Sequence, residues 1–298
     1  MKRILLSMVL LTAMLVISQS AEARRRVKVR KAPAKQTNVI RKSELKEFAP
    51  IIFGTDSIVM DSPLITMEEM GMHSGTMIYV CSLPEVKAPS MLTFSDCRDY
   101  AQVFVDDEYI GKIDRTKNER TIEIPPVHDG QELKILVDAI GRLNKDTSST
   151  DFVGLSDQII LAADIDGNEL TLNLKCWTIL TIPDGYETAI KALAAAQSTE
   201  ETLNSSETSI TPKGAGYYRY NVVFSRSGSI YLNMDNFGRG QVFVNGNSLG
   251  HFSDSESKQS LQVLRRYLKR GFNEVVVFDV IGSNSTDKTP SLQAQDKP

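Results

Sequence analysis

The sequence predicts an all-β protein built from antiparallel sandwiches or barrels, and three observations support this fold class. Apolar and polar residues alternate in short runs such as 101–105, 133–137 and 169–174, which is the period of a half-buried strand. Turn-forming Asp, Asn and Gly residues separate the runs. The same pattern returns after residue 215, so we expect two β domains of ordinary size.

The expected elements follow from this alternation. In chain order, the expected strands cover residues 76–80, 101–105, 120–124, 133–137, 159–161, 169–174, 177–182, 217–224, 229–233, 241–244, 260–263 and 274–280. Residues 43–49 (SELKEFA) predict a short helix. Residues 188–204 begin with an Ala-rich helical run and become rich in Ser, Thr and Glu, so we expect an insertion or linker there.

A repeated hairpin is the most informative feature. Residues 101–113 read AQVFVDDEYIGKI and residues 240–252 read GQVFVNGNSLGHF, with five coincidences 139 residues apart. Asp138 and Asp279 coincide at 141, which predicts a two-residue difference between the copies. Asn245-Gly246 predicts a type I′ turn, and the Gly of the return strand predicts a bulge or a close backbone approach.

The N-terminus predicts export. Residues 1–23 combine Lys2 and Arg3, an apolar stretch and a small-x-small cleavage site, which is typical of a signal peptide. We therefore expect a periplasmic, cell-surface or secreted protein, with no later membrane-spanning segment. The basic run that follows, 24–35, is interpreted as a solvated leader, with adhesion to an acidic surface as the alternative. A net charge of −3 argues against a nucleic-acid binder.

Cysteine and acidic residues suggest little metal or redox chemistry. With three cysteines, either one disulfide forms, most simply Cys81–Cys97, or all three are buried thiols. No CxxC or Cys/His cluster is present, so we expect no structural zinc. The run from Asp164 to Asn168 is explained by a hairpin turn, although a structural calcium ion stays open as the alternative to having no cofactor.

Several segments together resemble the all-β region of glycoside hydrolase family thirty-five β-galactosidases. They are SPLITMEEMGMHSGTMIYVCSL (62–83), AQVFVDDEYIGKIDR (101–115), ILVDAIGRLN (135–144), GLSDQIIL (154–161), CWTIL (176–180), GAGYYRYNVVF (214–224) and NFGRGQVFVNGNSLGHF (236–252). The resemblance implies two jelly-roll sandwiches of the galactose-binding-like type. It also implies that the family's catalytic glutamates lie on a preceding barrel of about 250 residues. Only some 20 residues lie between the expected cleavage site and the resemblance, so we expect no enzyme activity.

The expected domain organisation follows. Residues 1–23 are the signal peptide, 24–57 a basic segment with a short helix, 58–172 the first jelly roll, 173–284 the second with an insertion at 186–212, and 285–298 a disordered tail. The leading functional hypothesis is an exported, non-catalytic protein that binds a glycan or glycoside. The alternatives are a structural partner that docks a separate hydrolase or other exported protein, and a weak or relic β-galactosidase.

Three residues are candidates for contact with a carbohydrate. Trp177 is the only Trp, but its apolar run favours a core position over a sugar-stacking platform. Tyr218 alternates with Tyr217 and Tyr220, so some of these rings face outward. His251 follows the repeat Gly, where the family often has Arg.

Overall fold

The computed structural model describes residues 39–98, 100–106, 108–139, 152–200, 214–225, 229–254, 259–282 and 292–295, with side chains of the helix described to residue 198. All of them belong to one compact unit, Asn38–Pro298. The expected signal peptide and the basic leader lie outside the described residues. No helix in the described ranges is long and apolar enough to cross a membrane.

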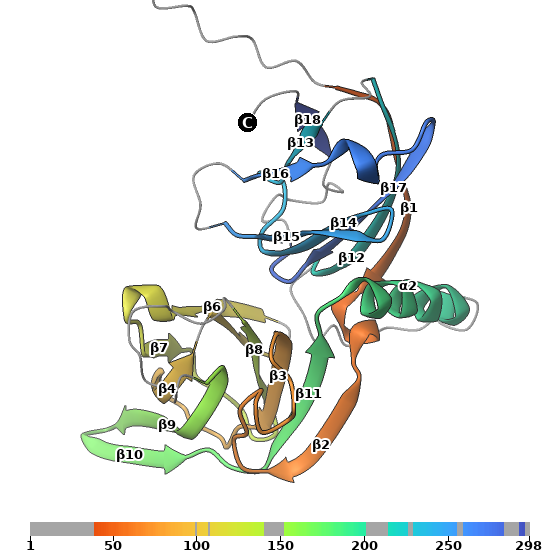
Figure 1. Ribbon diagram of the computed structural model, residues 1–298. Coiled ribbons are helices and arrows are strands. Elements are labelled where there is room, and N and C mark those ends of the chain that lie inside the picture. The colour runs from red at the N-terminus through yellow and green to blue at the C-terminus, as the bar shows by residue number, and fades with distance from the viewer. Residues whose placement is uncertain are drawn as a thin grey trace, which may run out of the picture. The chain divides into compact units, whose positions relative to one another are not determined.

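Two sheets form the first sandwich (Figure 1). The six-stranded sheet has the order β2 (Ser57–Ser62), β11 (Trp177–Pro183), β3 (Gly75–Ser82), β8 (Glu132–Asp138), β5 (Tyr100–Val105) and β6 (Glu108–Asp114). The four-stranded sheet has the order β10 (Asn168–Asn173), β9 (Gly154–Ile165), β4 (Ser90–Arg98) and β7 (Thr121–Ile124). The paired strands are antiparallel, and the inner faces enclose a core that includes Tyr79, Phe94 and Trp177.

Two further sheets form the second sandwich. The five-stranded sheet has the order β1 (Ile40–Pro50), β12 (Gly216–Phe224), β17 (Phe272–Asp279), β14 (Gly240–Val244) and β15 (Asn247–Phe252). The three-stranded sheet has the order β16 (Ser260–Val263), β13 (Ile230–Asn233) and β18 (Gln293–Gln295). Their core includes Tyr218, Tyr220 and Phe237. The prediction of an all-β fold with two antiparallel sandwiches is therefore confirmed.

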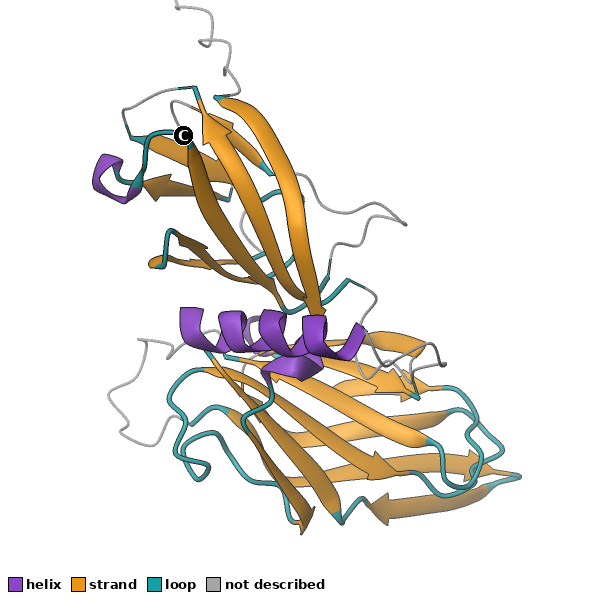
Figure 2. Cartoon of the chain, turned by 90° about the vertical axis from the view of Figure 1, so that its right-hand side faces the viewer, coloured by secondary structure: helices purple, strands orange, loops and turns teal. Residues whose placement is uncertain are grey.

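A third core lies outside both sandwiches. It joins Phe104 and Leu136 of the six-stranded sheet to Phe243 and Phe278 of the five-stranded sheet. The helix α2 (Tyr186–Glu200) contributes Ala189, Ala192, Leu193 and Ala196 to this core, as does the 3-10 helix η1 (Ile51–Gly54) through Ile51 (Figure 2). Because α2 buries this face, the helical part of the expected insertion is a packed element. Residues 201–213 lie outside the described ranges.

Local sequence signals misplaced several boundaries. Residues 43–49 are not helical, because β1 pairs with β12 from Ile40 to Pro50 and so belongs to the second sandwich. The boundary at 172/173 is too early, because β11 pairs with β2 and β3 of the first sandwich. Within the tail that was expected to be disordered, Gln293–Gln295 pairs with β13. In each case a partner distant in sequence satisfies the backbone hydrogen bonds, which local propensity does not reveal.

Short 3-10 helices complete the described secondary structure. These are η2 (Arg115–Lys117), which follows β6, and η3 (Arg265–Tyr267), which follows β16. Asp114 begins η2, where its side chain accepts hydrogen bonds from the backbone N–H and the hydroxyl of Thr116. The backbone bond satisfies an N–H in the first turn of η2 that has no partner within the helix.

Candidate functional site

The two copies of the hairpin meet through one face each. In the first hairpin, β5 and β6 present Tyr100, Gln102, Phe104, Tyr109 and Lys112 on the face that carries Phe104, which we call the first hairpin face. In the second, β14 and its partner β15, with the residue that precedes β14, present Arg239, Gln241, Phe243, Ser248 and His251, which we call the second hairpin face. The members correspond one to one, 139 residues apart.

The hairpins form as the turn chemistry predicts. Asn245 and Gly246 have φ of +50° and +81°, which confirms the type I′ turn. A bulge interrupts each pair, between Val103 and Phe104 in the first hairpin and between Val242 and Phe243 in the second. The bulge restores the alternation so that Tyr109 and Lys112 share a face, as do Ser248 and His251.

The coinciding Asp residues do not occupy equivalent places. Gln102 pairs with Leu136 in the first sheet, whereas Gln241 pairs with Phe278 in the second, so the copies differ by three residues between these strands. The expected difference of two is therefore wrong by one. Since side chains alternate between faces, Asp138 lies on the side of Leu136 and the third core, whereas Asp279 lies on the side of the second sandwich core.

Asp279 organises the connection into β14. One of its carboxylate oxygens accepts the backbone N–H groups of Arg239, Ile281 and Gly282, and the other accepts that of Gly238. Burial nevertheless raises the pKa of Asp279 to about 6, because loss of hydration outweighs the four donors. The carboxylate thereby fixes the loop that delivers Arg239 to the second hairpin face.

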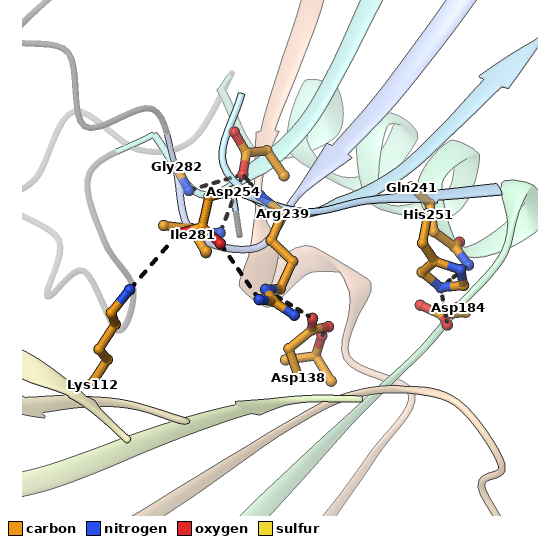
Figure 3. A network of polar contacts seen from close by, with 11 residues as sticks. Lys112, Asp138, Asp184, Arg239, Gln241, His251, Asp254, Ile281 and Gly282 are labelled. Carbon is orange, nitrogen blue, oxygen red and sulfur yellow. Dashed lines mark hydrogen bonds and ion pairs between the residues drawn. The ribbon is translucent and has the colours of Figure 1, made fainter. Parts of the chain in front are cut away.

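Arg239 crosses from the second hairpin face to the first (Figure 3). Arg239 is only 4% exposed, and its guanidinium carbon lies 4.3 Å from the centre of the Tyr100 ring. Its Nε lies 4.0 Å from Asp138 and its Nη2 lies 3.4 Å from Asp254. A buried cation is costly unless it is paired, and two carboxylates with an aromatic face meet that need.

Tyr100 receives a second cation. The ammonium nitrogen of Lys112 lies 5.3 Å from the centre of the ring and 3.9 Å from an Asp254 oxygen. Burial, followed by the charge of Asp254, raises the pKa of Tyr100 to about 12, so its hydroxyl stays protonated near neutral pH. Two cations, Lys112 and Arg239, therefore lie over one ring, and each lies within 4.0 Å of a carboxylate.

A second polar group holds His251 beside the linker to α2. Its Nε2 lies 3.3 Å from an oxygen of Asp184 and 2.8 Å from the amide nitrogen of Gln241 (Figure 3). Gln241 Oε1 has no hydrogen-bond partner within the described residues. If the side-chain amide of Gln241 is turned by 180°, its Oε1 accepts a hydrogen bond from the Nε2–H of His251. That N–H is also directed at Asp184. The hydrogen bond with Asp184 raises the pKa of His251.

The three candidates from the sequence fall in different environments. Trp177 is buried in the core of the first sandwich. Tyr218 is buried in the core of the second, where its hydroxyl donates to the Gly214 carbonyl. Neither offers a ring face to a ligand in this structure. His251 has a side chain that is 57% exposed, and its role in carbohydrate contact stays a prediction.

The sequence reasoning missed the residues that the structure brings together. Tyr109 is half-exposed, and its ring packs in a tilted arrangement against Phe104, at 5.5 Å between ring centres. Tyr109 lies opposite Phe104, one of the residues shared by the two repeats, on the face that points away from the first sandwich core. The sequence could have indicated this only if the position of the bulge had been known. Arg239 stood in the motif Phe237-Gly238-Arg239-Gly240, but nothing local shows that its side chain crosses to the other sandwich.

The expected cysteine and metal chemistry is revised as follows. Cys81 and Cys97 are buried and not joined to each other, whereas Cys176 is exposed, so neither expected arrangement holds as stated. Asp164 accepts the backbone N–H of Gly167, which is the hairpin turn expected there. The described residues contain no group of three or more His, Cys, Asp or Glu side chains that could hold a metal ion. A structural calcium ion stays a prediction.

Comparison with known proteins identifies both sandwiches. Residues 63–175 match the family model for the first all-beta domain of beta-galactosidase, and residues 215–273 match that for its galactose-binding domain. The first match contains the whole first hairpin, and the second match contains the whole second hairpin.

Individual relatives give the same result. The chain is 27% identical over 251 residues to beta-galactosidase-1-like protein 3 of Mus musculus, which covers 79% of this chain and 34% of that protein. It is 27% identical over 195 residues to the beta-galactosidase of Xanthomonas manihotis, covering 65% and 28%. A solved lectin of Pleurotus ostreatus in complex with GalNAc has a TM-score of 0.30 and 12% identity, covering 85% of this chain and 79% of the lectin, which is too distant to inform fold or ligand.

The chain spans about a third of the length of these curated relatives. Both matched regions are all-β domains, and together they contain both hairpin faces. The chain therefore carries the first all-β domain and the galactose-binding domain of the β-galactosidase family.

Proposed function

We propose that the chain is an exported, non-catalytic protein that binds a carbohydrate. The observation that carries the proposal is the match of residues 215–273 to the galactose-binding domain of β-galactosidases. The signal-peptide pattern of residues 1–23 supports export. Ligands of this kind are held by ring stacking and by a few polar groups, and the contact between the hairpin faces presents both.

The placement of the carboxylates supports a non-catalytic role for the described domains. Glycoside hydrolysis uses two carboxyl groups about 5 to 9.5 Å apart across the scissile bond. Asp138 and Asp254 instead bracket Arg239, and Asp184 is bonded to His251. These carboxylates are therefore already engaged by side chains of the protein itself.

A glycan-array screen of the purified protein tests the binding function. We expect binding to β-galactosides or to other saccharides, and no binding to any of them would contradict the proposal. Sequencing the N-terminus of protein recovered from the exported fraction tests export, with cleavage after Ala23 as the expected result.

A docking role is a second candidate, favoured by one edge strand. In β2, Ile58 is 59% exposed and Met60 is 72% exposed, next to a sheet edge that has no neighbouring strand among the described residues. Exposed apolar residues on an edge strand mark contact sites or aggregation hazards. Replacing both by Ser would abolish co-elution with a partner β-galactosidase if the strand docks it, and would leave glycan binding unchanged.

A third candidate, weak hydrolysis, has a direct test. Turnover of an aryl β-galactoside by the purified protein would support it. A rate that persists in a variant with Asp138, Asp184 and Asp254 all replaced by Asn would assign the turnover to a contaminant or another site.

A further inference from the structure

We propose that Tyr109, Lys112 and Asp254 form a binding site for a neutral hexopyranoside, at the contact between the first hairpin face and the second sandwich. This inference rests on the proposed carbohydrate-binding function. It adds a location, which neither the family match nor the sequence provides, and a sugar class.

Tyr109 supplies a flat apolar surface that is already fixed. The residue is 51% exposed, and its ring packs against Phe104 at a tilt of 58°, with 5.5 Å between the ring centres. Phe104 belongs to the third core, so the ring under Tyr109 cannot move freely. Sugar rings present a face of C–H groups that packs on such a surface. A ring held in advance loses little conformational entropy when the ligand binds.

Lys112 and Asp254 supply hydrogen-bonding groups beside that surface. Both are partly exposed, and the 3.9 Å between Lys112 Nζ and the Asp254 oxygen is too long for a direct hydrogen bond. A sugar hydroxyl placed between them would accept from the ammonium group and donate to the carboxylate. Tyr109 and Lys112 lie on the same face of β6, opposite Phe104 and Gln102, and Lys112 reaches Asp254, so the ring and the two polar groups are neighbours.

The charges at this place favour an uncharged ligand. Lys112 and Arg239 are cationic, while Asp138 and Asp254 are anionic, and each cation lies within 4.0 Å of a carboxylate. An anionic sugar would meet Asp254, and a cationic one would meet Lys112. A neutral hexopyranoside meets neither penalty, because its hydroxyls both donate and accept.

The second hairpin face lacks the same combination. Ser248 occupies the position that corresponds to Tyr109, and His251 occupies that of Lys112. His251 is already bonded to Asp184 and Gln241. The second hairpin itself therefore contributes no aromatic ring at this position. Tyr186 of α2 packs on Phe243 instead, at 5.8 Å between ring centres, but its hydroxyl is already bonded to Glu274, so we expect the site at the first hairpin.

Titration calorimetry of the full protein with methyl β-D-galactopyranoside tests the site, with methyl β-D-glucuronide as the charged comparison. We expect Tyr109→Leu, which keeps the apolar cover of Phe104 without the flat ring, to weaken binding at least about tenfold. Lys112→Met should weaken it about threefold to tenfold. Phe272→Leu is the matched control, since Phe272 is also exposed with a lysine, Lys42, above its ring. It should change affinity less than about twofold.

The outcomes separate this proposal from the broader one. If the wild type binds the galactoside and Tyr109→Leu binds equally well, the site is wrong and carbohydrate binding stands. Preference for the glucuronide would overturn the neutral class in the same way. If the wild type binds no saccharide in either experiment, both proposals fail. Should Tyr109→Leu not fold, Lys112→Met and Asp254→Asn together decide, and unchanged affinity in both would overturn the site.

Discussion

The two hairpins share one backbone and present different faces. Both contain the same bulge, and both carry Gln and Phe at the same outward positions. They differ at three equivalent positions: the first hairpin has Tyr100, Tyr109 and Lys112 where the second has Arg239, Ser248 and His251. Because the faces meet, two identical copies would oppose like groups. The differences place a guanidinium on an aromatic ring instead, which turns a repeat into a complementary pair.

The largest expected difference between the copies concerns Asp279 and Asp138. Asp279→Ala removes the acceptor of four backbone N–H groups in a buried loop, and we expect a loss of about 3 kcal/mol in the free energy of unfolding. Asp138→Ala should cost less, about 1 kcal/mol, because its bond from the Thr76 hydroxyl is long, at 3.3 Å, and the Arg239 guanidinium lies 4.0 Å away. Urea denaturation measures both, and equal losses would refute the opposite placement of the two side chains.

The repeat glycines should differ in how their substitution can be rescued. Gly250 has a φ of +106° and no neighbour within 4 Å of an added Cβ, so Gly250→Ala should cost about 1–2 kcal/mol through backbone strain. At Gly111 an added Cβ would lie 2.7 Å from Ile122 Cδ1, so Gly111→Ala costs about 1 kcal/mol through a clash.

Ile122→Val removes that methyl group and is the matched test. In thermal denaturation it should restore most of the stability lost in Gly111→Ala and none of that lost in Gly250→Ala. Rescue of both, or of neither, would contradict the assignment of two different causes to one repeat position.

Arg239→Lys sharpens the comparison of the two faces, since the first face already uses a lysine over Tyr100. A lysine keeps the charge but loses the planar stack and the reach to Asp254, so we expect a loss of about 1 kcal/mol. A double-mutant cycle with Tyr100→Leu checks the coupling between the two sandwiches. Strictly additive effects would show that the stacking contributes no stability.

The smallest expected effect is a pH dependence of stability carried by His251 of the second hairpin face. The hydrogen bond with Asp184 raises the pKa of His251, so its contribution is complete below the unfolded value of 6.5 and is lost as the pH rises through the folded value. Because the side chain is exposed, we expect about 0.5 kcal/mol or less.

Comparing wild type with His251→Asn between pH 6.5 and 8 isolates this term. Asp279 contributes little to this comparison. Its pKa is raised to about 6 in the folded protein, so its effect is a loss of stability between about pH 4 and pH 6 that changes little at higher pH and is the same in both proteins. A wild-type profile that runs parallel to the variant profile would exclude His251 as the source.

Local patterns predicted most of the strands and misread two segments. In residues 43–49, Leu45 and Phe48 lie three apart among charged residues, which suggests a helix, but β12 offers a long antiparallel partner. In the tail, only the pairing of Gln293–Gln295 with β13 and the burial of Leu292 and Ala294 make a strand. Neither partner lies close in the sequence.

The candidate site was less predictable than the fold. Trp177 and Tyr218 are rare or periodic aromatics, and such patterns do not tell an inward from an outward ring when both sheet faces are buried. Here both faces of the central sheets are covered, one by its own sandwich and the other by the third core. Tyr109 lies at the edge of that third core, where burial ends.

The sequence by itself determined that the protein is all-β, that it contains one hairpin twice, and that the second hairpin turns at Asn245-Gly246. These follow from alternation and from residues that tolerate positive φ, which are properties of neighbouring residues. Only the tertiary structure decided that Asp138 and Asp279 face opposite ways and that Arg239 reaches Tyr100. Strand register depends on pairing with distant segments, and a shift of one residue moves a side chain to the other face.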